Sequence, residues 1–153
     1  MMKKFQFTLQ KLMDFREQEL DRQKNALAVL QGDLKRINDR RDELTEKVVK
    51  YSNDLVKSSA AGLPAAEISM RKRYIVTLQQ EIHECEQRAI LKQQEIDKQL
   101  SVVVDATKDV RTLEKLEEKQ LEEYKAAEGK ENELFIEEFV SGGAVRGAIA
   151  AQK

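Results

Sequence analysis

The chain has 153 residues, of which 36% are charged and only 5% aromatic, with one proline and no tryptophan. This composition excludes a broad globular core and is typical of long helices and coiled coils. Lysine and arginine number 27 against 28 aspartate and glutamate residues, and the two signs are interleaved. This balance argues against a nucleic-acid-binding arm, so no nucleic-acid partner is expected.

The first ten residues, MMKKFQFTLQ, lack the continuous apolar run of a signal peptide. No stretch approaches the roughly 20 apolar residues that span a bilayer. Cys85 is the only cysteine, which excludes an internal disulfide and fits a reducing compartment. We therefore expect a soluble, cytoplasmic protein.

A stripe of residues spaced alternately three and four apart runs through the first third of the chain. This 3.5-residue repeat predicts a helix over residues 8–57 whose apolar stripe another helix must cover. Only three of its members are polar. The stripe consists of Leu9, Met13, Arg16, Leu20, Gln23, Leu27, Leu30, Leu34, Ile37, Arg41, Leu44, Val48, Tyr51 and Leu55.

A glycine and the single proline, at positions 62 and 64, predict a turn at about residues 58–66. A second, weaker stripe runs from Ile68 to Leu113 and loses phase beyond Leu113. The second helix is predicted to stop at residues 141–143, with residues 141–153 forming a flexible tail. The predicted fold is all-α, with two long helices forming an antiparallel coiled-coil hairpin over residues 1–140.

Folding the chain about Leu63 pairs residues whose numbers sum to 126. This register stacks Leu44 on Ile82 and Met13 on Leu113, although a shift by one heptad stays open. The charges beside the stripes do not decide between these two registers. Lys47 would attract Glu81, whereas Asp33 with Glu95, and Arg40 with Arg88, would repel. The second helix is expected to outrun the first beyond about residue 125.

The overhanging end carries Phe135, Ile136, Phe139 and Val140 within one and a half helical turns. Such an exposed apolar cluster is typical of a surface that binds a partner. The aromatic residues at positions 5 and 7 precede the first stripe, so both groups are expected to lie together. Capping of the coiled coil by these aromatic residues is the alternative.

The sequence carries no pattern that indicates catalysis, a cofactor or a metal. His83 and Cys85 are two residues apart, so they point to different sides of a helix and make a poor metal pair. Cys85 is better explained as a small apolar member of the second stripe. Glycine-rich phosphate loops and nucleophile motifs are absent, and the many carboxylates recur as a solvated face. We expect no enzymatic activity.

One local excess of positive charge stands out. It comprises residues 71–73, of sequence RKR, together with Arg36, Arg40 and Arg41 on the facing helix. Phosphate groups or an anionic membrane surface are potential ligands of such a patch. A solvated helix face and a partner protein with an acidic rim are the alternatives.

The segment FQFTLQKLMDFREQE at residues 5–19, followed by two long helices broken near Gly62 and Pro64, resembles the bacterial flagellar FliJ family. These proteins are stalks of the type III export ATPase and are related to YscO-type proteins of virulence secretion. Further matches are Tyr74-Ile75 just after the turn and the segment LEKLEEKQ at residues 113–120. The resemblance covers nearly the whole chain.

The resemblance implies a non-enzymatic stalk that links a hexameric export ATPase to the cytoplasmic domain of a membrane export-gate protein. It also implies the exchange of export chaperones and a location at the inner face of the cell membrane. The end with both termini would enter the ATPase, and the turn would face the gate. A monomeric hairpin suffices for this role.

Two sets of contact residues are expected on this basis. Packing within the stripe is an alternative explanation for each residue of the gate contact except Tyr74. The gate contact comprises Leu44, Tyr51, Tyr74 and Leu78. The ATPase contact comprises Phe5, Phe7, Leu134, Phe135, Ile136 and Phe139.

Two other classes of function stay open. The first is a structural coiled-coil tether, in which two chains could pair as a dimer. The second is a nucleic-acid-associated coiled coil that uses the basic residues named above.

Overall fold

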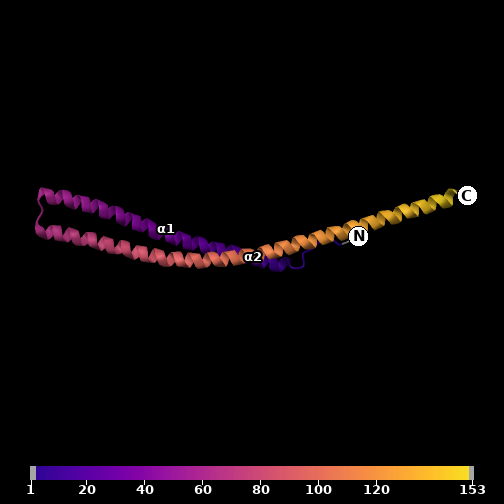
Figure 1. Cartoon of the computed structure of the whole chain (residues 1–153), viewed down its shortest axis with the longest axis horizontal. Helices are drawn as coiled ribbons and strands as arrows, with labels where there is room; N and C mark the ends of the chain where they lie inside the picture. Colours follow the sequence, from indigo (N-terminus) through magenta and orange to yellow (C-terminus); the bar gives the residue numbers. More distant parts are fainter. Residues whose placement is uncertain (1–2, 152–153) are drawn as a thin grey trace. The chain divides into compact units, whose positions relative to one another are not determined.

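The computed structural model describes residues 3–151, with side chains for residues 3–143. It contains two helices, α1 (Gln10–Ala61) and α2 (Ala65–Ala151), and no strand within that range. Figure 1 shows α1 and α2 lying side by side from the short turn that joins them. The predicted all-α antiparallel hairpin is confirmed. Within residues 3–151, neither helix has a stretch that is both apolar and long enough to cross a membrane.

The turn between the helices is set by a glycine and a proline. Gly62 has a φ of +98°, and its N–H donates to the carbonyl of Ser59 at 3.2 Å. A left-handed glycine of this kind is a common helix end, because it lacks the Cβ that would clash. The Pro64 carbonyl then accepts the N–H groups of Glu67 and Ile68, both at 3.1 Å. Proline is tolerated at the start of a helix because no intrahelical donor is needed there.

The end of α2 differs from the prediction. Ser141, Gly142 and Gly143 were expected to stop the helix, but α2 continues to Ala151. Each glycine destabilises a helix by about 1 kcal/mol relative to alanine, which is not enough by itself to end the helix. The alanine-rich sequence that follows favours the helix, and no proline interrupts it. The expected flexibility of the tail stays a prediction, and its last residues, 152–153, lie outside the described part of the chain.

The contacts divide the chain into two compact units. The first, here called the turn unit, comprises residues 20–106. Leu44, Leu78 and Cys85 form a buried cluster in it. Ile37, Val48 and Ile82 are partly buried against this cluster. The predicted neighbours Leu44 and Ile82 thus belong to one cluster.

The second unit, here called the terminal unit, comprises residues 1–19 and 107–153. Phe7, Met13 and Leu113 form its buried core, and Leu116 packs against them. The predicted pairing of Met13 with Leu113 is therefore confirmed.

The second stripe was predicted to lose phase beyond Leu113, but in the structure it continues. Half-buried positions continue at Glu117, Gln120 and Tyr124, with the same three-and-four spacing. The stripe was missed because its next two members are polar. The extended segment before α1 covers this part of α2, since the ring of Phe5 lies 5.5 Å from that of Tyr124.

Polar members of the stripes find partners across the hairpin. Arg16 Nη1 lies 3.8 Å from Asp109 Oδ2 in the terminal unit. In the turn unit, the Gln99 side-chain amide donates to the side-chain oxygen of Gln23 at 2.7 Å and to its backbone carbonyl at 3.0 Å. No side-chain nitrogen or oxygen of the described residues is buried without a hydrogen-bond partner.

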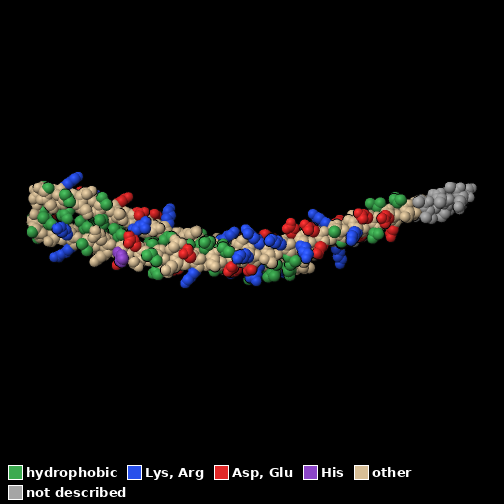
Figure 2. Space-filling view, viewed as in Figure 1, with side chains coloured by type: hydrophobic (Ala, Val, Ile, Leu, Met, Phe, Trp, Pro, Cys, Tyr) green, Lys and Arg blue, Asp and Glu red, His purple; other side chains and the backbone are tan. Residues whose placement is uncertain are grey.

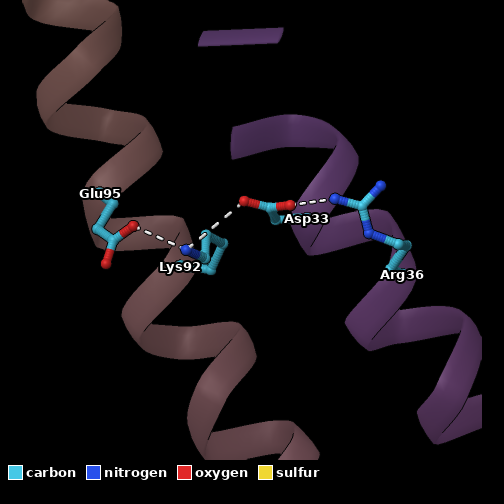
Figure 3. Close-up of polar contacts among 4 residues, drawn as sticks. All are labelled: Asp33, Arg36, Lys92 and Glu95. Carbon is cyan, nitrogen blue, oxygen red and sulfur yellow. Dashed lines mark hydrogen bonds and ion pairs between the residues drawn. The ribbon is translucent and has the colours of Figure 1, made fainter. Parts of the chain in front are cut away.

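A charge network spans the helices in the middle of the turn unit (Figure 3). Lys92 Nζ lies 2.9 Å from Glu95 Oε2 and 3.9 Å from Asp33 Oδ2, and Arg36 also pairs with Asp33. Lys92 thus lies between Asp33 and Glu95 and offsets the repulsion predicted for these two carboxylates. The pairing of directly opposite residues did not anticipate this, because the long lysine side chain reaches both carboxylates.

Candidate functional site

The two tyrosines nearest the turn form an exposed aromatic pair. The rings of Tyr51 on α1 and Tyr74 on α2 lie 5.4 Å apart at an interplanar angle of 77°, an edge-to-face contact. Their exposed fractions are 37% and 47%. The pair closes the apolar stripe on one side while leaving much of both rings accessible to a partner.

A shallow groove adjoins the tyrosine pair. It is lined by Tyr51, Asp54, Met70, Arg71 and Tyr74. Arg71 Nη2 lies 3.0 Å from Glu67 Oε1, one helical turn away, so this guanidinium is already paired within α2. The groove therefore offers two aromatic rings, a thioether and a carboxylate. This chemistry suits contact with a protein surface that carries apolar groups.

The other two residues expected at the gate contact lie in the core. Leu44 and Leu78 are only 1% and 4% exposed and pack with Cys85 between the helices. A residue so deeply buried offers no surface to a partner unless the helices separate. The structure therefore supports stripe packing, the alternative that the sequence left open, for Leu44 and Leu78. Tyr51 and Tyr74 are the accessible members of that set.

The aromatic residues at the start of the chain stabilise the terminal unit. Phe7 is buried against Met13 and Leu113, and Phe5 packs beside this cluster. Tyr124 contacts Phe5 and donates its hydroxyl to the Lys3 carbonyl at 2.6 Å. These contacts agree with the interpretation that the first aromatic residues cap the coiled coil.

The apolar cluster near the end of α2 has a different environment. Its side chains are 59–75% exposed and belong to no buried cluster of the described residues. On the face drawn in Figure 2, this part of α2 carries hydrophobic and acidic side chains before the grey residues begin. The cluster comprises Leu134, Phe135, Ile136, Phe139 and Val140. We call it the α2 end cluster.

The expectation that the amino-terminal aromatic residues and the α2 end cluster lie together is wrong. Phe5 packs on Tyr124, and Leu134 follows about 15 Å further along α2 at 1.5 Å per residue. The α2 end cluster is thus a separate accessible surface.

The basic residues in the middle of the hairpin are neutralised by neighbouring carboxylates. Arg40 lies 3.4 Å from Glu43 and 3.8 Å from Glu81, measured between side-chain nitrogen and oxygen atoms. Arg41 lies 3.2 Å from Asp42. Glu81 therefore faces Arg40, not the predicted Lys47. These ion pairs weaken the nucleic-acid hypothesis, which needs unpaired cations here.

Cys85 and His83 are separated as expected. Cys85 is 1% exposed in the core of the turn unit, where Arg88 Nη2 donates to its sulfur at 3.4 Å, whereas His83 is exposed. The prediction that Cys85 is an apolar member of the stripe is confirmed. Among the residues that the structure describes, no three His, Cys, Asp or Glu side chains are grouped to hold a metal ion.

Comparison with known proteins adds one consistent finding. A family model described as "Flagellar FliJ protein" matches residues 5–147. The flagellar FliJ protein of Bacillus subtilis (strain 168) is 23% identical over 144 residues, which cover 91% of this chain and 98% of that protein. No solved structure gives a significant match.

Proposed function

Because the chain belongs to the family of flagellar FliJ proteins, we propose that it is a non-enzymatic stalk of the bacterial flagellar protein export apparatus. In this role it links a hexameric export ATPase to the cytoplasmic domain of a membrane export-gate protein. It also assists the exchange of export chaperones. The protein works in the cytoplasm, at the inner face of the cell membrane, as a monomeric hairpin.

One observation carries this proposal. The apolar side chains that the hairpin leaves exposed include the tyrosine pair in the turn unit and the α2 end cluster in the terminal unit. Exposed aromatic side chains are common anchors of protein interfaces, since they bury a large area with few rotatable bonds. Two such surfaces in different units suit a protein that binds two partners.

We assign the α2 end cluster to the ATPase. The acidic character of α2 before this cluster supports an interface with a basic lining. Residues 114–138 hold ten acidic and four basic residues, a net charge of −6. Charge complementarity of this kind speeds association and selects the partner.

The test is co-purification of the ATPase with the Phe135→Ala/Phe139→Ala variant. Both rings are exposed, at 69% and 75%, so helicity should persist while retention of the ATPase falls at least about tenfold. The matched control is Ile90→Ala/Leu91→Ala, which removes two exposed apolar side chains from the turn unit. Retention of the ATPase at the wild-type level by the phenylalanine variant would refute the assignment.

We assign the tyrosine pair to the gate protein. Here Tyr51→Ala/Tyr74→Ala should abolish binding of the gate protein's cytoplasmic domain and leave ATPase binding intact. Val49→Ala/Val76→Ala is the control, because both valines are about half exposed and lie close to the tyrosines in sequence. Equal binding of the gate protein by the two variants would show that the tyrosine pair does not form the contact.

The tether alternative makes a different prediction about the number of chains. Sedimentation at micromolar concentration should give the mass of one chain for a hairpin that covers its own stripe. A dimer under these conditions would favour a structural tether instead.

A further inference from the structure

The turn end of the hairpin is strongly basic, although the whole chain carries a net charge of −1. Residues 47–80, here called the basic end, contain only Asp54 and Glu67 as acidic residues, against six basic ones, a net charge of +4. The basic residues are Lys47, Lys50, Lys57, Arg71, Lys72 and Arg73.

Five of these six cations lack a carboxylate partner. Arg71 is paired with Glu67, but the other five side chains are exposed and form no ion pair with any described residue. Further along the turn unit the opposite holds, because Arg36, Arg40 and Lys92 are each paired with a carboxylate. The positive charge of the basic end is therefore available to an external anion.

Exposed apolar side chains lie among these cations. Val56, Met70 and Val76 are 50–70% exposed, in addition to the tyrosine pair. On the face drawn in Figure 2, the turn end shows basic side chains among hydrophobic ones. Partly exposed tyrosine rings, apolar side chains and flexible lysines are the mixture found at membrane–water interfaces.

We propose that the basic end binds the surface of an anionic phospholipid membrane directly. Clusters of four to eight basic residues recognise anionic lipid, each contributing about 1 kcal/mol near the surface. This inference deepens the proposed function, on which its cellular setting rests. The contact itself is with lipid headgroups and needs no export-gate protein.

The distribution of charge favours a membrane over a nucleic acid. Glu81, Glu84 and Glu86 follow directly after the basic end and would repel a long polyanion lying along the hairpin. Glu81 follows Arg73 by eight residues, about 12 Å along α2. At physiological salt its charge is therefore largely screened from a membrane surface that contacts the residues nearest the turn. The four lysines among the six cations also suit loose contact with headgroups better than the fixed geometry of bidentate recognition.

The test is flotation of the full chain with vesicles of phosphatidylcholine, with and without a third of phosphatidylglycerol. The chain should float with the anionic vesicles at low salt, and neither with the neutral ones nor at high salt. A quadruple glutamine variant should lose at least about tenfold of its partitioning, because each basic residue contributes about fivefold. This variant replaces Lys50, Lys57, Lys72 and Arg73.

The matched control removes the same charge from the terminal unit. Glutamine at four exposed lysines of α2 should leave partitioning unchanged, and circular dichroism should show equal helicity for both variants. The control lysines are Lys115, Lys119, Lys125 and Lys130. Equal partitioning of the two variants, or no flotation with anionic vesicles, would overturn the proposal. Retention on DNA or on an acidic polypeptide without flotation would overturn it as well.

A fluorescence measurement places the contact on the chain. Because the chain has no tryptophan, Val56→Trp reports from the basic end alone and Ile90→Trp from a more distant part of the turn unit. Anionic vesicles should shift the emission of the first variant to the blue and leave that of the second unchanged. Failure of this test would leave the ATPase and gate assignments intact, since those experiments contain no lipid.

Discussion

The Gln99 side-chain amide donates a hydrogen bond to the side-chain oxygen of Gln23 on the facing helix, at 2.7 Å. This pair is a polar layer within an otherwise mainly apolar stripe. A polar layer of this kind can specify the register of a coiled coil at some cost in stability, because a shifted register would leave the amides without partners. The pairing also shows that Gln23 and Gln99 belong to the same layer of the hairpin.

Replacement of the two glutamines should show what this layer contributes to the free energy of unfolding. Gln99→Ala should lower the free energy of unfolding by about 1 kcal/mol, since one hydrogen bond is lost at a half-buried site. Gln23→Leu/Gln99→Leu should instead raise it, because two apolar side chains replace the amides. Urea denaturation followed by circular dichroism measures both changes. A double leucine variant less stable than the wild type would contradict this account.

Leu44 should behave as a core residue. At 1% exposure, Leu44→Ala should lower the free energy of unfolding by about 2–4 kcal/mol, the sum of the lost transfer energy and the cavity left behind. Val49→Ala is the control on the same helix, at 56% exposure, and should change it by less than about 0.5 kcal/mol. Urea denaturation distinguishes the two. A small effect at Leu44 would show that this layer is not packed as described.

Substitution of two glycines by alanine should change the stability of the protein in opposite directions. Gly62→Ala should destabilise the protein by about 1–2 kcal/mol, because its φ of +98° is unfavourable for a residue with a Cβ. Gly129→Ala lies within α2 with no side chain in the way and should stabilise that helix by up to about 1 kcal/mol. Thermal unfolding compares the two variants. A stabilising Gly62→Ala would mean that the turn differs from the one described.

Cys85 should be unreactive in the folded protein. Its thiol is 1% exposed, so a disulfide reagent such as DTNB should label it slowly in buffer and rapidly in denaturing urea. Leu44→Ala should accelerate labelling in buffer, because it loosens the cluster that covers the sulfur. The rate of thionitrobenzoate release measures the effect. Rapid labelling of the native wild type would show that the turn unit opens readily.

The sequence by itself determined the two helices, except for the end of the second, and the turn between them, and it gave the register to within one heptad. The three-and-four spacing allows only one face of each helix to be covered, and a glycine and the proline interrupt the pattern at a single place. Met13 and Leu113 could therefore be paired in advance. The apolar character of the α2 end cluster was also visible in the sequence. Its exposure could be predicted because the cluster lies beyond the reach of the first helix.

Only the tertiary structure decided which members of the stripe are accessible. Leu44 and Tyr51 share one stripe, yet the first is buried and the second is more than a third exposed, because burial depends on the side chains of the facing helix. The ion pairs were decided in the same way. Lys92 reaches carboxylates on both helices through a long side chain whose direction no spacing rule gives. The physical reason is that periodicity defines a direction from the helix axis, whereas contact requires the shape of the partner.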